Sequence, residues 1–286
     1  MQVISTTNSE CLNPRRFRSY FTLYMRSERR KLLLGASLFF IFPFLFILFL
    51  YYTENGMYRW SEYENFDPFW NIESGVFIIF IFLFMAVSGS WMFQVYTGKR
   101  KRLGCIELPA SQWEKFLTWW IVCVPLCLVA IFISFWFVDV LRVLWIKAFT
   151  PYGDKAMLYP LKNLLSLVEK PYPIGYSWTL PGNLVGLVYS LLIATNAIFA
   201  LGSVLFHKLS FLKTIGSIFV LIVVYSIIFM SGSSSFFSTG VAQLSSRYDM
   251  EPTGNLIFAM IVAAVSLCIY GFCYARMKEE DIIDRW

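Results

Sequence analysis

The sequence predicts an all-α integral membrane protein, with six transmembrane helices and an amphipathic interfacial helix near the N-terminus. Of its 286 residues, 58% are hydrophobic and only 15% are charged, whereas soluble domains average about 25% charged residues. Six stretches contain no Asp, Glu, Lys or Arg: 32–53, 74–98, 116–138, 171–206, 214–246 and 252–275. Because a helix crosses a bilayer with about 20 apolar residues, each stretch is long enough to span.

The charge-free stretches locate the spans. We expect them at about 32–52, 74–97, 116–142, 182–206, 214–231 and 255–275. The first contains Phe39 to Phe42 and Leu45 to Leu50, which are apolar on every face of a helix; lipid or protein must surround such a helix on all sides. The expected organisation is a cytoplasmic N-terminus over 1–31, a membrane domain over 32–275 and a tail over 276–286.

The segment before the first span has the pattern of an amphipathic helix. Asn13 can cap it, and Pro14 suits its first position. Aromatic residues then recur at helical spacing, with basic residues on the other face: Phe17, Tyr20, Phe21 and Tyr24. We expect the aromatic side to face lipid and the basic side to face headgroups. The alternative is an ordinary basic flank without a helix.

The basic residues also predict the orientation. With these spans, 17 of the 24 Lys and Arg residues fall on the side that holds both termini. Since cytoplasmic loops are rich in Lys and Arg, both termini are expected in the cytoplasm and the chain in the cell (inner) membrane. The net charge of +6 is explained by this asymmetry, so membrane lipids are the expected partners and nucleic acid is not. The pattern does not indicate a role for the loop 143–181.

A basic cluster and a helix start separate the second and third spans, where residues 98–115 read GKRKRLGCIELPASQWEK. The cluster consists of Lys99, Arg100, Lys101 and Arg102. Pro109 keeps Leu108 extended, and Ser111 with Glu114 forms the S-x-x-E pattern of a capping box. A helix should therefore start sharply at about Gln112, which leaves a compact, anchored element suited to docking a partner.

Catalytic patterns are missing from the sequence. It has no GxxxxGK[ST] phosphate loop and a single histidine, so we expect no enzyme activity, no catalytic residue, no metal and no cofactor in this chain. Asn196 lies in the middle of the fourth span and is the polar side chain that costs the most free energy to place in the membrane. It should bond another helix or line a pathway. Phe236 and Phe237 lie in a Ser/Gly-rich segment, 232–254, which either re-enters the bilayer or forms a loop.

Six spans, the basic N-terminal helix and the LPAS-QW-EKF stretch at 108–116 resemble permease subunits of ABC exporters of the ABC-2 type, particularly those of Bacteroidota. The resemblance implies a separate ATPase subunit, a second permease chain, and a re-entrant outer segment that places Phe236 and Phe237 on a pathway. It also implies that the segment between spans two and three couples to the ATPase through Lys99, Arg100, Lys101, Arg102, Leu108, Pro109, Ser111 and Glu114. The large loop before the fourth span departs from the family's pattern, and the substrate is not indicated.

The sequence also leaves room for two other classes of function. A membrane scaffold or sensor that anchors a cytoplasmic partner would also need a basic cytoplasmic face. A membrane enzyme that acts on lipids is disfavoured, because the required acid, base or metal-ligating residues are missing.

Overall fold

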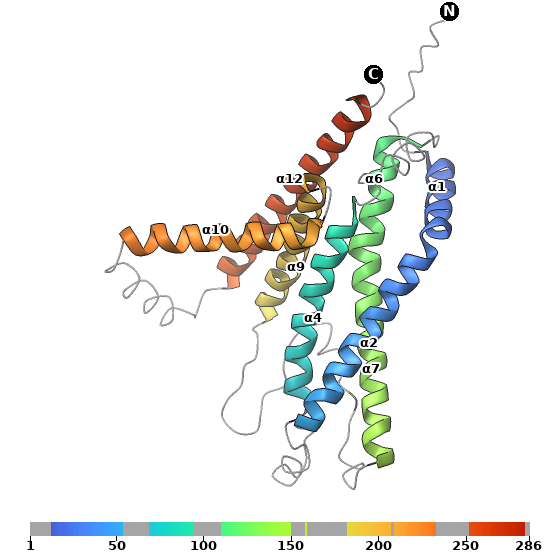
Figure 1. The fold of residues 1–286 in the computed structure, drawn as a ribbon, viewed down its shortest axis with the longest axis vertical. Helices are drawn as coiled ribbons and strands as arrows, with labels where there is room; N and C mark the ends of the chain where they lie inside the picture. The colour runs from blue at the N-terminus through green and yellow to red at the C-terminus, as the bar shows by residue number, and fades with distance from the viewer. Residues whose placement is uncertain are drawn as a thin grey trace, which may run out of the picture.

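A computed structural model of the chain describes residues 13–53, 69–93, 110–149, 158, 182–206, 209–232 and 252–283. This described part is entirely helical and contains no strand. Its helices are α1 Pro14–Ser27, α2 Arg29–Thr53, α4 Phe69–Trp91, α6 Gln112–Ile121, the π-helical turn η2 Val122–Leu126, α7 Cys127–Phe149, α9 Gly182–Leu205, α10 Ser210–Gly232 and α12 Pro252–Ile283. Most of them run lengthwise in one bundle, as Figure 1 shows.

Helices long and apolar enough to cross a membrane are present. Among the described residues there are four: Arg29–Ile47, Gln112–Ala148, Val185–Leu205 and Leu256–Glu279. The other two expected spans fall on the shorter apolar stretches Val76–Trp91 and Ser210–Val224. The chain therefore has the character of a membrane protein, and crossing by all six helices stays a prediction.

The third expected span is one helical stretch with a π-helical turn inside it. This turn, η2, contains Pro125, which has no backbone N–H and cannot complete a regular α-helical bond. In a regular α-helix the Cys127 amide would bond to the Cys123 carbonyl; here it bonds to the carbonyl of Val124. The turn thereby makes the Cys123 carbonyl available to other donors.

Helix α9 lies at the centre of the bundle, packed against α4 on one side and α12 on another. The approach to α4 is close at Gly89, where a Cβ atom would lie 2.3 Å from the backbone oxygen of Asn196. Glycine is therefore required at this crossing. Buried apolar side chains of α4, α6, η2, α7, α9 and α12 form the core around it.

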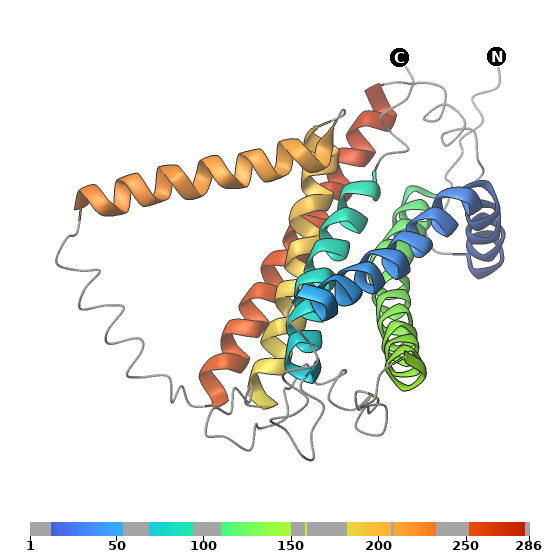
Figure 2. The same cartoon turned by 60° about the horizontal axis from the view of Figure 1, so that its bottom comes forward.

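Helix α10 departs from the expected arrangement, because it runs across the other helices and projects from the bundle in both Figure 1 and Figure 2. The turn before it contains Leu209 in the left-handed region, with φ of 54°. The start of α10 is fixed by the Ser210 hydroxyl, which donates to the Ser90 carbonyl at 3.4 Å, and by Thr214, which packs directly on Gly202 of α9. The apolar period of the sequence predicts this helix but not the direction of the turn.

Candidate functional site

The start of α1 follows the sequence pattern. The Asn13 side chain accepts a hydrogen bond from the Arg15 amide at 3.1 Å, and Pro14 occupies the first helical position. The aromatic face, however, turns toward the protein: Tyr20 is only 7% exposed, and Tyr24 packs against the core. The expected contact of this face with lipid is thus replaced, at Tyr20, by contact with the protein itself.

The start of α6 has the predicted capping box. The Ser111 hydroxyl accepts from the Glu114 amide at 3.3 Å, and the Ser111 amide donates to Glu114 Oε2 at 2.9 Å. Two amides at the N-terminal end of the helix, which have no partner within it, are satisfied in this way. This part of the prediction is confirmed.

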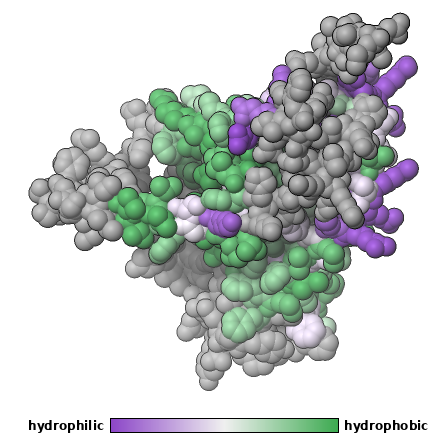
Figure 3. Space-filling view, turned by 45° about the horizontal axis from the view of Figure 1, so that its top comes forward, coloured by the Kyte–Doolittle hydropathy of each residue, from purple (hydrophilic) through white to green (hydrophobic). Residues whose placement is uncertain are grey.

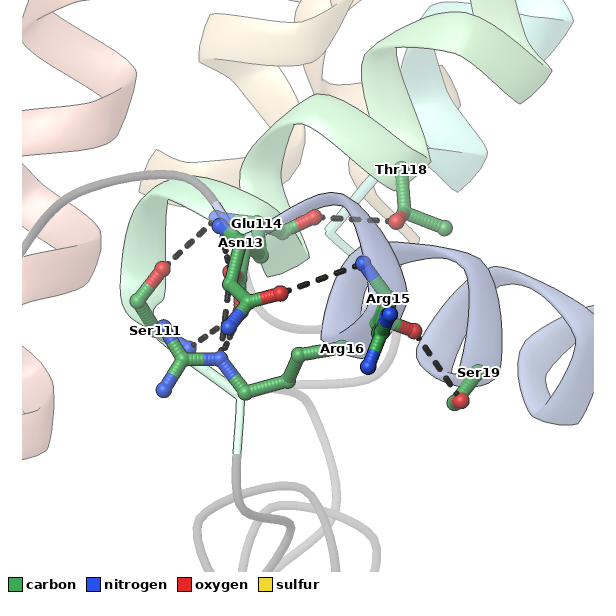
Figure 4. Close-up of polar contacts among 7 residues, drawn as sticks. All are labelled: Asn13, Arg15, Arg16, Ser19, Ser111, Glu114 and Thr118. Carbon is green, nitrogen blue, oxygen red and sulfur yellow. Dashed lines mark hydrogen bonds and ion pairs between the residues drawn. The ribbon is translucent and has the colours of Figure 1, made fainter.

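The Glu114 carboxylate also reaches α1, about 100 residues earlier in the chain. The backbone amide of Asn13 donates to Glu114 Oε1 at 2.9 Å. Arg16 Nε lies 3.1 Å from Oε1 and 2.9 Å from Oε2. Figure 4 shows these contacts between the two helix starts. We call Asn13, Arg16, Ser111 and Glu114 the Glu114 cluster. One carboxylate therefore accepts from the N-cap amides of two helices and fixes α1 to α6.

The electrostatics of the cluster favour the charged form of Glu114, which lies before the expected span 116–142. Its side chain is fully buried, whereas that of Arg16 is 30% exposed. Burial alone would raise the pKa of this carboxyl. The hydrogen bonds from the Asn13 and Ser111 amides and from Arg16, together with the Arg16 charge, outweigh burial and hold the pKa below its ordinary value of 4.5.

A second polar group, the Asn196 cluster, lies inside the bundle. The Asn196 side-chain amide donates to the Met85 carbonyl at 3.0 Å and to the Cys123 carbonyl at 3.3 Å. Its oxygen accepts from the Tyr270 hydroxyl at 2.7 Å, and the Ser88 hydroxyl also donates to the Cys123 carbonyl. One side chain of α9 thus joins α4, η2 and α12.

Of the two roles expected for Asn196, the structure shows the bonds to other helices, and the residue is fully buried. Its bond to Cys123 depends on the π-helical turn, which makes that carbonyl available. The remaining predicted site residues lie outside the described residues: Lys99, Arg100, Lys101, Arg102, Leu108, Pro109, Phe236 and Phe237.

The sequence did not indicate that Asn13 and Arg16 bond to Glu114, since no local signal links residues so far apart. It also did not indicate that Asp139 and Arg142 form a buried ion pair, with Arg142 Nη2 2.7 Å from Asp139 Oδ1. Their spacing of three residues on one helix face was an available signal. In the part of the chain that the structure describes, no group of three or more His, Cys, Asp or Glu could hold a metal ion.

Comparison with known protein families, curated proteins and solved structures finds no match to this chain. The chemistry of the Glu114 cluster must therefore be interpreted on its own. Its carboxylate accepts from two backbone amides and one guanidinium group, so the arrangement suits a rigid connection between α1 and the third expected span.

Proposed function

We propose that this chain is the membrane-spanning permease subunit of an ATP-driven exporter of the ABC-2 type. Two such chains, identical or related, would form the translocation path in the cell membrane, with both termini in the cytoplasm. A separate ATPase would supply the energy by docking on the segment Lys99–Ser111. The Glu114 cluster carries this proposal.

The cluster supports coupling because of where the docking segment ends. Ser111 is both the last residue of that segment and the N-cap of α6. Glu114 bonds to the Ser111 amide and to the Asn13 amide, so a displacement of Ser111 would move α1 and α6 together. Since α6 continues through η2 into α7, the displacement would pass into the third expected span.

The test is co-purification of an ATPase with the full chain. Leu108→Asp places a charge in the expected docking segment, and Leu158→Asp, at an exposed position in the expected outer loop, is the matched control. Leu108→Asp should abolish ATPase binding at normal membrane levels, whereas Leu158→Asp should leave binding unchanged. Full ATPase binding and coupled transport in Leu108→Asp would contradict the docking role, and a chain that captures no ATPase would favour the scaffold alternative.

The orientation has a separate test that uses a chain without its native cysteines. A cysteine introduced at Asn65 should react with a membrane-impermeant thiol reagent in intact cells, and one at Lys278 should not. Labelling at Lys278 alone would reverse the proposed topology.

A further inference from the structure

Helix α1 carries an open groove along one side, beyond the Glu114 cluster at its start. The groove has a volume of about 620 Å³ and is lined by Arg18, Ser19, Thr22, Leu23, Arg26 and Ser27. These six side chains are exposed, whereas Tyr20 of the same helix is buried. The bonds that Asn13 and Arg16 donate to Glu114 hold the start of α1 against α6.

The groove offers positive charge. The hydroxyl protons of Ser19, Thr22 and Ser27 are already donated to carbonyls of the same helix, at 3.1, 2.8 and 3.0 Å. The donors that face a ligand are therefore the guanidinium groups of Arg18 and Arg26. Residues 14–27 contain no acidic side chain, so the groove suits an anion, and guanidinium geometry matches phosphate oxygens.

The position of the groove indicates where the anion comes from. Only Glu28 separates α1 from α2, whose stretch Arg29–Ile47 is apolar and long enough to cross a membrane. Figure 3 shows hydrophilic side chains gathered on the side of the molecule where α1 lies, next to a hydrophobic surface. Leu23, 48% exposed, adds an apolar contact between the arginines.

We propose that this groove binds the phosphate groups of anionic lipids in the leaflet that α2 enters. Basic residues beside a membrane helix attract such lipids. An acidic protein surface would match the charge, but the exposed leucine and the adjacent membrane helix favour a lipid headgroup. The proposal requires only that α2 crosses the membrane, and it stands whether or not the chain serves an exporter.

The experiment is native mass spectrometry of the full chain in detergent, titrated separately with phosphatidylglycerol and phosphatidylcholine. The wild type should prefer phosphatidylglycerol. Each basic residue near a membrane contributes about 1 kcal/mol, a factor of about five, so Arg18→Gln with Arg26→Gln should reduce this preference about 25-fold. The control, Arg276→Gln on α12, removes an arginine that is 48% exposed but is paired with Glu279 at 3.0 Å, so it should change the preference far less.

A charge-retaining pair, Arg18→Lys with Arg26→Lys, should keep more of the preference than the glutamine pair, because the charge remains although the guanidinium geometry is lost. An unchanged preference in the double glutamine variant would overturn the proposal, as would an equal loss in Arg276→Gln. Competition by inorganic phosphate as effective as that by phosphatidylglycerol would assign the groove to free phosphate instead. If the wild type shows no lipid preference and an acidic peptide displaces bound phosphatidylglycerol, the groove would instead be assigned to a protein partner.

Discussion

The Glu114 cluster and the Asn196 cluster solve the same problem with opposite chemistry. Each uses one fully buried polar side chain to join helices that are distant in sequence. Glu114 is an anion and accepts from backbone amides and a guanidinium. Asn196 is neutral and donates to two backbone carbonyls while it accepts from one hydroxyl.

The difference follows from which backbone groups the helices leave available. At the starts of α1 and α6, amides have no partner within the helix, so a carboxylate can be buried there. At η2, the π-helical turn makes a carbonyl available, and a carbonyl needs a donor. An anion in the middle of the bundle would face carbonyl oxygens and would lack the compensation that Arg16 gives Glu114.

The largest expected effect comes from placing a charge in the Asn196 cluster. Asn196→Asp keeps the shape of the side chain but replaces the donor that faces the Met85 and Cys123 carbonyls with an acceptor. Because an uncompensated buried charge costs about 3–5 kcal/mol, we expect the free energy of unfolding to fall by at least about 3 kcal/mol. Thermal or denaturant unfolding in detergent measures this.

The control for that substitution is Asn196→Ser, which loses hydrogen bonds without adding charge. Interhelical hydrogen bonds in membrane proteins contribute about 0.6 kcal/mol on average and about 1.7 at most, so the serine variant should lose far less stability. Equal stability of the aspartate variant and the wild type would contradict the proposed match between side chain and backbone.

The reciprocal substitution, Glu114→Gln, should have a smaller effect. The substitution removes the charge and points a side-chain N–H₂ group toward the backbone amides of Asn13 and Ser111. The loss is limited because Arg16, which is 30% exposed, can turn to solvent. Hydrogen bonds to charged groups contribute about 1.5–3 kcal/mol, so we expect a loss of about 2 kcal/mol and faster tryptic cleavage within α1. Glu279→Gln, which disrupts an exposed pair with Arg276, should change little; equal effects would mean that burial of the Glu114 pair is unimportant.

The two clusters also differ in how far the sequence predicts them. The capping box was predictable because Ser111 and Glu114 lie within one helical turn, where spacing fixes geometry. The extension of Glu114 to Asn13 depends on how α1 packs, which local pattern does not specify. Asn196 was recognisable as a costly polar group in an apolar helix, yet its partner Cys123 depends on the bonding of the π-helical turn around Pro125. Likewise α10 was predicted as a helix, but the apolar pattern does not specify the left-handed conformation of Leu209 directly before it.

Acid should weaken the Glu114 cluster only below pH 4.5, the ordinary pKa of a glutamate carboxyl. Because the folded-state pKa of Glu114 lies below its ordinary value of 4.5, the carboxylate's contribution is fully present above pH 4.5. It declines as the pH falls through the lowered pKa, by at most about 1.4 kcal/mol per pH unit. Tryptic accessibility after brief acid exposure, or detergent unfolding across pH 3–6, should show this decline in the wild type and not in Glu114→Gln. An identical pH dependence in both would place the transition elsewhere.

The smallest expected effect is that of Tyr270→Phe. This substitution removes the hydroxyl that donates to the Asn196 oxygen at 2.7 Å but leaves the ring and the two carbonyl contacts of Asn196 in place. The average value for such bonds in membranes predicts a loss of about 0.6 kcal/mol. The control is Tyr274→Phe, whose ring packs on Trp113 and Phe116.

A double-mutant cycle of Tyr270→Phe with Asn196→Ser isolates their coupling energy. The cycle of Arg16→Gln with Glu114→Gln does the same for the charged cluster. If a buried charge is favoured only where unpaired helix-start amides lie beside a cation, the charged pair should be the more strongly coupled. The coupling energy between Arg16 and Glu114 should then exceed that between Tyr270 and Asn196. The reverse order would mean that the neutral cluster is the stronger connection.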